Sequence, residues 1–423
     1  MIAVTDTTLE IQKKFSLMYK ELVKTFPQIP DIQYREFAFL FWDKIYMIRH
    51  RGFNNAQLFY SELKAGPPQH VYHSAALYYD PANKIMTEKG WFGCDFVVDI
   101  DADHMQVPCQ ETHDYFICST CDYVSKETIT KCPKCEGSIR KQQWLCDLCL
   151  EASKKEVIRL VEDFLPDFGF TKDHVKVNFS GHRGYHIHLQ DEFLRKMNSN
   201  ERRQIVDYLT GTNFDPKDCL IYNDSNGYFT GTSIDDPGWK GRVARKFLEI
   251  LSKCDSIDSF ERTYGMYYLE NKLKHILFES DARNKLIHQL TTKSRFWVHF
   301  DLTKTSWEKI KNFLIAASKC DIDIPVSIDT HRLIRVQGSI HGKTGFVAKP
   351  LNYYEMVNFN PLADPVIFSM DEESYMGINI STPICPEIRI KDQIFGPYKK
   401  NEKISVPEAV AVFLICKGVA EIS

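Results

Sequence analysis

The chain has 423 residues, enough for roughly two or three domains around a substantial core. Hydrophobic residues make up 43% and charged residues 26%, as in ordinary globular proteins, and no apolar run reaches the about 18 residues of a transmembrane helix, so we expect no membrane association. The formal net charge of −3 leaves nucleic-acid binding open, since a local basic groove can exist in a nearly neutral chain. The first residues do not resemble a signal peptide, and singly scattered cysteines are typical of a reducing, cytoplasmic compartment.

Strand and helix signals alternate along the chain, which predicts a mixed α/β fold. Apolar residues at helical spacing indicate helices, and aromatic or β-branched runs bounded by turn residues indicate strands. In chain order we expect a helix at 8–24, strands at 70–79 and 96–101, a helix at 151–166, strands at 175–179 and 185–189, helices between 200 and 290, a strand at 294–302 and a helix near 306–319.

Strand signals lie on both sides of the helical block, so a single core must be assembled from separate parts of the sequence. We expect the following division: a first part of the core at 1–103, a cysteine-rich insert at 104–150, a second part of the core at 151–200, a mainly helical insertion at 201–292, and a third part of the core with the C-terminal segment at 293–423.

Three acidic residues end the strand-like segment FVVDIDADH. Residues i and i+2 of a strand share a face, so Asp99 and Asp101 project together. Two such carboxylates repel each other unless a divalent cation lies between them, as in two-metal sites for phosphoryl or nucleotidyl transfer. A strand end with exposed acids is the plainer alternative. Asp103 has the same parity but is expected beyond the end of the strand.

The segment SIDTHRLIRVQGSIHGKTGF supplies a candidate third carboxylate. Asp329 is followed by Arg332 and Arg335, and then by His341 and Lys343 between glycines. The glycines permit a tight turn, and the basic side chains can meet phosphate oxygens. An ordinary basic loop would explain any one of these residues, but less readily an acid followed by four basic candidates.

Two other acid pairs are interpreted as structural. Asp321 and Asp323 directly precede Pro325, which favours a loop and an interrupted strand. Asp235 and Asp236 lie in DDPGW, a sequence typical of turns. We therefore expect neither pair to bind a metal ion.

The segment SGHRGYHIHL predicts a strand–turn–strand unit that could bind an anion. Ser180, Gly181 and Gly184 form a small turn whose backbone N–H groups can face a phosphate. Arg183 offers a planar guanidinium for the same purpose, and His186 lies on the following strand. A single histidine is more often structural, but the combination favours a triphosphate site.

Three of these motifs, FVVDIDADH, SGHRGYHIHL and DTHRLIRVQGSIHGKTG, occur in this order and resemble those of the small catalytic subunit of archaeal and eukaryotic DNA primases. REFAF, MIRH, KGWFGCDFVVDID and the terminal VPEAVAVFLICKGVAE resemble its archaeal branch. The resemblance implies a primase-polymerase fold, a mixed α/β catalytic core with an RRM-like sheet. It implies catalytic Mg²⁺ or Mn²⁺ at Asp99, Asp101 and Asp329, triphosphate contacts from Ser180, Arg183, His186, Arg335 and His341, further contacts from Arg332 and Lys343, and sugar contacts from Glu36 and Arg49.

The same resemblance implies a function and partners. The expected activity is synthesis of short primers on a single-stranded DNA template from NTPs or dNTPs, with release of pyrophosphate and formation of a primer/template hybrid. The expected partner is a large, iron–sulfur-containing primase subunit. Alternatives are a repair-type primase-polymerase that extends ends or gaps, and a zinc-dependent nucleic-acid-binding subunit without catalysis. His182 stands where an arginine is common.

The cysteine-rich insert contains eight candidate ligands, enough for about two tetrahedral zinc sites. We favour a nested pairing, because the regular CxxC spacing forms a local ribbon inside an outer set that resembles the family's usual zinc knuckle. The inner set is Cys118, Cys121, Cys132 and Cys135, and the outer set is Cys109, His113, Cys146 and Cys149. The competing pairing joins Cys109 and His113 with Cys118 and Cys121, and Cys132 and Cys135 with Cys146 and Cys149.

Overall fold

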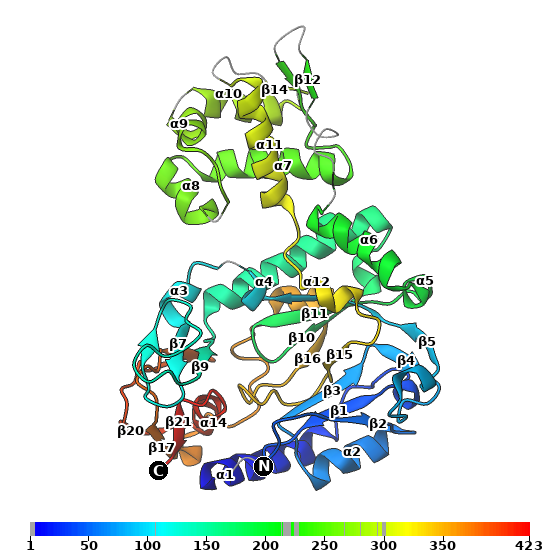
Figure 1. The fold of residues 1–423 in the computed structure, drawn as a ribbon, viewed down its shortest axis with the longest axis vertical. Helices are drawn as coiled ribbons and strands as arrows, with labels where there is room; N and C mark the ends of the chain where they lie inside the picture. The colour runs from blue at the N-terminus through cyan, green and yellow to red at the C-terminus, as the bar shows by residue number, and fades with distance from the viewer. Residues whose placement is uncertain are drawn as a thin grey trace. The chain divides into compact units, whose positions relative to one another are not determined.

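The chain was analysed as a computed structural model that describes residues 5–105, 107–212, 214, 221–223, 228–265, 267–279, 281–293, 295–297 and 302–423. It divides into two compact units (Figure 1). The first comprises Met1–Ile158, Lys172–Arg202 and Ile322–Ser423, and the second comprises Arg159–Thr171 and Arg203–Asp321. Among the described residues, no helix is both long and apolar enough to span a membrane.

The first unit contains a four-stranded antiparallel sheet that joins the start of the chain to a segment near its end. Its strand order is β15-β3-β1-β2. Large aromatic side chains fill one of its faces, where Phe37 lies 4.9 Å from Phe59 and 5.1 Å from Phe53 between ring centroids. The strands are β1 (Phe37–Leu40), β2 (Ile48–Arg51), β3 (His70–Ser74) and β15 (Leu333–Arg335).

A second four-stranded antiparallel sheet carries the first two motifs, with strand order β16-β10-β11-β6. In its register, Asp99 is opposite His186 and Asp101 is opposite Gly184. The alternate residues Ile100 and Tyr185 are fully buried on the other face. The strands are β6 (Phe96–Asp101), β10 (Val175–Phe179), β11 (Gly184–Leu189) and β16 (Lys349–Asn352). The expected mixed α/β fold is confirmed.

Smaller elements complete the first unit. Its helices are α1 (Asp6–Leu22), α2 (Ala56–Ala65), α3 (Gln110–His113), α4 (Asp147–Arg159), α5 (Glu192–Lys196), α12 (Ile324–Ile328), α13 (Tyr353–Asn358) and α14 (Glu408–Cys416). Its smaller sheets pair β4 (Ala76–Tyr78) with β5 (Trp91–Cys94), β7 (Tyr115–Cys118) with β8 (Val124–Ser125) and β9 (Ile139–Gln142), β17 (Met376–Ile380) with β20 (Lys403–Val406) and β21 (Ala420–Ile422), and β18 (Ile388–Ile390) with β19 (Gln393–Phe395).

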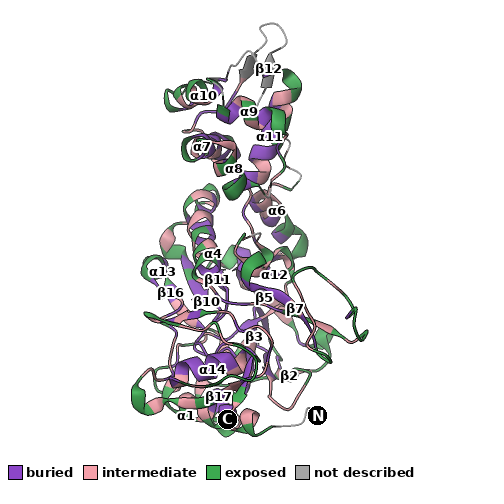
Figure 2. Ribbon diagram, turned by 90° about the vertical axis from the view of Figure 1, so that its left-hand side faces the viewer, coloured by how far each residue is buried: buried purple, intermediate pink, exposed green. Residues whose placement is uncertain are grey.

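Helix α14 is apolar all round and lies in the core of the first unit, as Figure 2 shows by its purple colour. Such a helix is stable only when other elements cover every side of it. Phe413 stacks on Phe346 and meets Trp144 edge-on, so α14 packs against both the third motif and the cysteine-rich insert.

The second unit is mainly helical and extends further along the chain than the helical insertion expected at 201–292. Strand β14 (Phe296–Trp297) pairs with β13 (Tyr228–Thr230), and the buried Trp297 packs against Trp307 of α11. These contacts place both elements in the helical unit and not in the core. Of the strand expected at 294–302, residues 294 and 298–301 lie outside the described residues. The remaining elements are α6 (Ser199–Thr210), which begins in the first unit, β12 (Ile221–Asn223), α7 (Gly238–Lys253), α8 (Ile257–Tyr264), α9 (Asn271–Glu279), α10 (Ala282–Thr291) and α11 (Lys304–Ser318).

Candidate functional site

A polar pocket of about 250 Å³ in the first unit brings the three sequence motifs together. Strand β6 contributes acids, the turn between β10 and β11 contributes small and imidazole side chains, and β15 with the loop after it contributes cations. The lining residues are Tyr72, Asp99, Asp101, Asp103, Gln143, Ser180, His182, His186, Val326, Arg332, Leu333, Ile334, Arg335, His341 and Lys343.

The acidic end of the pocket holds carboxylates that repel one another in the absence of a cation. Burial and the neighbouring charge of Asp323 raise the pKa of Asp99 to about 7. Burial and the charge of Asp103 raise the pKa of Asp101 to about 7 as well. Both shifts mean that ionised forms are disfavoured where no positive charge is bound. Carboxylate oxygens that are buried and repel one another suit a divalent cation such as Mg²⁺ or Mn²⁺, which would neutralise their charge.

The expected third acid, Asp329, does not line this pocket. It caps the C-terminus of α12, is exposed, and accepts a hydrogen bond of 2.8 Å from the backbone N–H of His331. Asp323, expected to be purely structural, lies nearer to the pair: its backbone N–H donates to the carbonyl of Asp99 at 2.8 Å. Of the two acids that flank helix α12, Asp323 is therefore the one in contact with the acidic end of the pocket.

The turn SGHRG is tightly constrained at the centre of the pocket. The Ser180 hydroxyl oxygen accepts hydrogen bonds from the N–H groups of His182 and Gly184, each at 3.3 Å, which leaves its own proton free to donate. Gly181 has φ of +83°, and a Cβ there would lie 2.7 Å from that of His341. A Cβ at Gly184 would lie 2.4 Å from the carbonyl oxygen of Ile100. Glycine at both positions lets the turn approach the third motif and strand β6.

His186 and His341, which both line the pocket, are neutral. Burial and the nearby cations Arg335 and Arg332 lower the pKa of His186 to about 4, and its Nε2 lies 3.7 Å from a carboxylate oxygen of Asp99. Burial and Arg335 lower the pKa of His341 well below its usual value. Neutral imidazoles in a basic environment can donate one hydrogen bond each to an anion.

The cations at the other end have no carboxylate partner. In the described parts of the chain, no carboxylate lies within ion-pair distance of Arg332, Arg335 or Lys343. Arg335 is buried and donates to the Nδ1 of His70 at 3.1 Å and to the hydroxyl of Tyr72 at 3.2 Å. A buried guanidinium held only by neutral groups gains from a bound anion.

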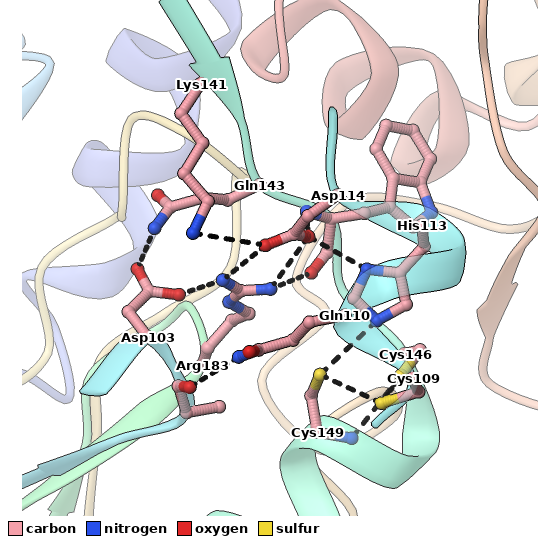
Figure 3. Close-up of polar contacts among 12 residues, drawn as sticks. Asp103, Cys109, Gln110, His113, Asp114, Lys141, Gln143, Cys146, Cys149 and Arg183 are labelled. Carbon is pink, nitrogen blue, oxygen red and sulfur yellow. Dashed lines mark hydrogen bonds and ion pairs between the residues drawn. The ribbon is translucent and has the colours of Figure 1, made fainter. Parts of the chain in front are cut away.

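Arg183 does not have the phosphate-binding role expected from the sequence. Its guanidinium is 0% exposed and does not line the pocket. One terminal nitrogen donates to the Trp144 carbonyl at 2.8 Å and to Asp114 at 3.1 Å, and the other donates to Asp103 (Figure 3). Both terminal nitrogens are therefore used inside the protein. The sequence predicted a phosphate contact for Arg183 because its acidic partners, Asp103 and Asp114, lie in a different segment of the chain.

Glu36 and Arg49 form a separate cluster outside the pocket lining. Glu36 is 0% exposed and accepts from Nε of Arg49 at 2.9 Å, while Lys89 lies 3.2 Å away. Burial raises the pKa of Glu36, but Arg49 and Lys89 outweigh it and the net pKa is lowered. The carboxylate is therefore ionised and fixed at the start of β1.

The eight expected zinc ligands are gathered in two groups in the nested arrangement. In the outer group, Sγ of Cys109 lies 3.4 Å from Sγ of Cys149, which lies 3.3 Å from Nε2 of His113. In the inner group, the pairs Cys118–Cys135 and Cys121–Cys132 are each 3.5 Å apart. Thiolates bound at about 2.3 Å to one tetrahedral zinc ion would be about 3.8 Å apart, so both groups fit a metal of this size.

Sequence reasoning missed Gln143, which joins the cysteine-rich insert to the pocket, and Lys417, which lies behind it. The Gln143 side chain donates to Asp103 (Figure 3). The backbone carbonyl of Gln143 accepts from Nζ of Lys417 at 2.8 Å. The only signal in the sequence was a lysine directly after a helix that is apolar from Ala409 to Cys416, a position that favours partial burial but gives no partner.

Comparison with known proteins gives a consistent result. The family model described as DNA primase small subunit matches residues 134–353. The DNA primase small subunit PriS of Methanocella arvoryzae is 32% identical over 419 residues, 93% of each chain. The chain belongs to the DNA primase small subunit family. PriS of Methanothrix thermoacetophila is 31% identical over 99% of each chain, and PriS of Nitrosopumilus maritimus is 28% identical over 89% of this chain and 88% of its own.

Membership in the primase small subunit family implies nucleotidyltransferase activity. The matched range 134–353 contains the SGHRG turn and the third motif but begins after Asp99 and Asp101. The near full-length relatives extend over that earlier segment as well. The segments matched by these relatives therefore include those that form the acidic end of the pocket.

Proposed function

We propose that this chain is the catalytic subunit of a DNA primase, which synthesises short primers on single-stranded DNA from nucleoside triphosphates and releases pyrophosphate. One observation carries the proposal: a single pocket combines carboxylates whose ionised forms are disfavoured with cations that have no carboxylate partner among the described residues. A metal-bound triphosphate has the complementary charges, since its metal ions meet the acids and its phosphates meet the cations.

The side chains have distinct parts in this proposal. Asp99 and Asp101 hold Mg²⁺ or Mn²⁺, and Asp329, which stands at the family's third position but outside the pocket lining, is assigned as the third ligand. When bound, these ions lower the pKa of the attacking 3′-hydroxyl and stabilise charge on the phosphate oxygens. The chain's own groups orient the triphosphate through the Ser180 hydroxyl, the neutral imidazoles of His186 and His341, and the cations of Arg332, Arg335 and Lys343. Glu36 and Arg49 are assigned to the nucleotide sugar.

The two cysteine groups are assigned to structural Zn²⁺, about one ion each. Ligand type supports this assignment, because three or four sulfur atoms with closed tetrahedral geometry are typical of structural zinc and not of Mg²⁺ or Mn²⁺.

The proposed partners are the DNA template, the primer/template hybrid and a large, iron–sulfur-containing primase subunit. Starting a chain requires two nucleotides to be held at once, whereas the pocket described above accounts for one triphosphate. We therefore expect this subunit alone to extend primers well and to start them slowly. Dinucleotide formation on unprimed template measures this, and equal initiation rates for the isolated chain and the reconstituted complex would contradict the division of labour.

Nucleotide incorporation on primed and unprimed template, with added Mg²⁺ or Mn²⁺, tests the function. The wild-type chain should incorporate nucleotide, and Asp329→Asn should reduce the rate by about 10³-fold or more, since the substitution removes a metal ligand and keeps the shape. Normal activity of this variant would refute the ligand assignment. Extension without any unprimed synthesis, even with the large subunit, would instead favour a repair-type polymerase.

A further inference from the structure

Lys417, directly after the buried helix α14, reaches the back wall of the pocket. Its backbone is held on both sides: its N–H donates to the Phe413 carbonyl at 2.9 Å, and its carbonyl accepts from Nε2 of Gln142 at 3.0 Å. The residue is 7% exposed. Nζ lies 2.8 Å from the carbonyl oxygen of Gln143 and 2.9 Å from Nε2 of His182, which itself lines the pocket.

The Lys417 ammonium lacks a neutralising partner. No carboxylate in the described ranges lies within ion-pair distance of it. Burial and the charges of Arg183 and Lys343 lower its pKa to about 7, although Asp103 and Asp114 act in the opposite direction. An anion bound in the pocket would favour the charged form and offset the cost of burying it.

The contact with Lys417 selects one tautomer of His182. Burial and Lys417 lower the pKa of His182 well below its usual value, so the imidazole is neutral. When Lys417 is charged, as it is below its pKa or beside a bound anion, its ammonium group has donors only, so Nε2 of His182 accepts and the ring proton must be on Nδ1. A ring nitrogen of His182 lies within 4.8 Å of carboxylate oxygens of Asp101 and Asp103.

His341 is fixed in the complementary way beside it. The two rings stack with centroids 5.2 Å apart and planes 13° apart. The backbone N–H of Lys343 donates to Nδ1 of His341 at 3.2 Å, which leaves the proton of this neutral ring on Nε2. The pair therefore offers two N–H donors to an anion, one held by the main chain and one held by Lys417.

We propose that Lys417 is a positioning residue for the triphosphate of the incoming nucleotide. It holds His182 in the Nδ1–H tautomer, so that this histidine donates to a phosphate oxygen, and it places positive charge directly behind the ring. The inference rests on the proposed function, because it assigns the triphosphate to this pocket. It excludes His182 as a metal ligand, since a protonated Nδ1 cannot coordinate a metal ion and Nε2 is occupied.

Nucleotide binding separates this role from a merely structural one. Lys417→Met keeps the length of the side chain but removes its charge and donors. We expect it to weaken binding of a nucleoside triphosphate, and to raise its KM in primer extension, by about tenfold, with nucleoside monophosphate binding and kcat changed less than about twofold. Lys417→Arg should recover part of the affinity. Lys403→Met, on the exposed strand β20, is the matched control and should change neither affinity.

Two outcomes of this experiment would overturn the proposal: unchanged triphosphate affinity in folded Lys417→Met, or equal losses for monophosphate and triphosphate, which would indicate a general collapse of the pocket. Should the variant fail to fold, nitrogen NMR of histidine-labelled wild-type protein gives an independent answer. At a pH of about 6, where Lys417 is charged, the Nδ1–H tautomer of His182 is expected, and an Nε2–H tautomer or an imidazolium would refute the inference. If the wild-type chain bound no nucleotide while showing the expected tautomer, the proposed function would fail and the Lys417–His182 contact would stand.

Discussion

Both cysteine groups contain a CxxC pair, but they differ in how they are connected to the rest of the first unit. In the outer group, His113 is buried and its Nδ1 lies 2.8 Å from Asp114, which also accepts from the Trp144 N–H at 2.9 Å. In the inner group, Cys121 and Cys135 are exposed, and the group is surrounded by the short strands of its own ribbon.

The outer group continues into the pocket through buried ion pairs, drawn in Figure 3. Asp114 binds Arg183, and Arg183 binds Asp103, the residue two positions beyond Asp101. Burial raises the pKa of Asp114, but its contacts with His113 and Arg183 outweigh this and lower the pKa well below its usual range. A ligand pattern in the sequence therefore does not reveal whether a metal site supports catalysis; the partners of its ligands do.

Breaking the connection at Arg183 should have the largest effect. Arg183→Met leaves the half-buried Asp103 without its cation and leaves the buried Asp114 with only the partly exposed Lys141 as a cation, which costs about 3–5 kcal/mol of unfolding free energy. We also expect the rate of primer extension to fall under conditions where the variant remains folded. The charge of Asp103, no longer neutralised by Arg183, then repels the charge of Asp101 more strongly. Chemical denaturation and primer extension measure the two effects.

Arg389→Met is the control for that experiment. Arg389 pairs with Asp147 near the outer group, but both side chains are partly exposed, so its loss should cost less than about 1 kcal/mol. Equal losses of unfolding free energy for the two substitutions would show that the Arg183 ion pairs stabilise the protein no more than a partly exposed ion pair does.

Removing one ligand from each cysteine group compares the contributions of the two groups to catalysis directly. We expect wild-type protein to contain about two zinc ions and each variant about one. Cys146→Ser should reduce primer extension at least tenfold, because it loosens the His113–Asp114–Arg183 connection, whereas Cys118→Ser should reduce it less than about threefold. Elemental analysis and extension rates, measured together, provide the result. Equal losses of activity would mean that the ribbon contributes to catalysis as much as the outer group does.

The smallest effect is expected at Asp101, at the end of the Asp114–Arg183–Asp103 connection, and this effect depends on pH. The folded-state pKa of Asp101 is raised to about 7, so its contribution to stability is complete below about pH 4 and is lost as the pH rises through 7. Without added divalent cations, Asp101→Asn should therefore be more stable than wild type at pH 8, by about 1 kcal/mol, and close to it at pH 5. Thermal unfolding at both pH values tests this. A stability difference that does not change with pH would contradict the raised pKa.

The sequence was most informative where local geometry alone decides the arrangement. Strand parity placed Asp99 and Asp101 on one face, and regular spacing grouped the cysteines, because both relations need only neighbouring residues. The surroundings of Arg183 and Lys417 were not foreseen, because they depend on partners far along the chain. Arg183 is neutralised by acids around the insert, and Lys417 meets His182 only because α14 is buried. No pattern within one segment encodes such contacts.

The most direct test of the account is to measure Mn²⁺ binding, zinc content and nucleotide incorporation together in wild type and Asp101→Asn. The account predicts that the variant keeps about two zinc ions and its fold, binds Mn²⁺ at least tenfold more weakly, and loses incorporation by about 10³-fold or more. Retained Mn²⁺ affinity and normal incorporation in a folded, zinc-containing variant would contradict the claim that this pocket is the catalytic centre.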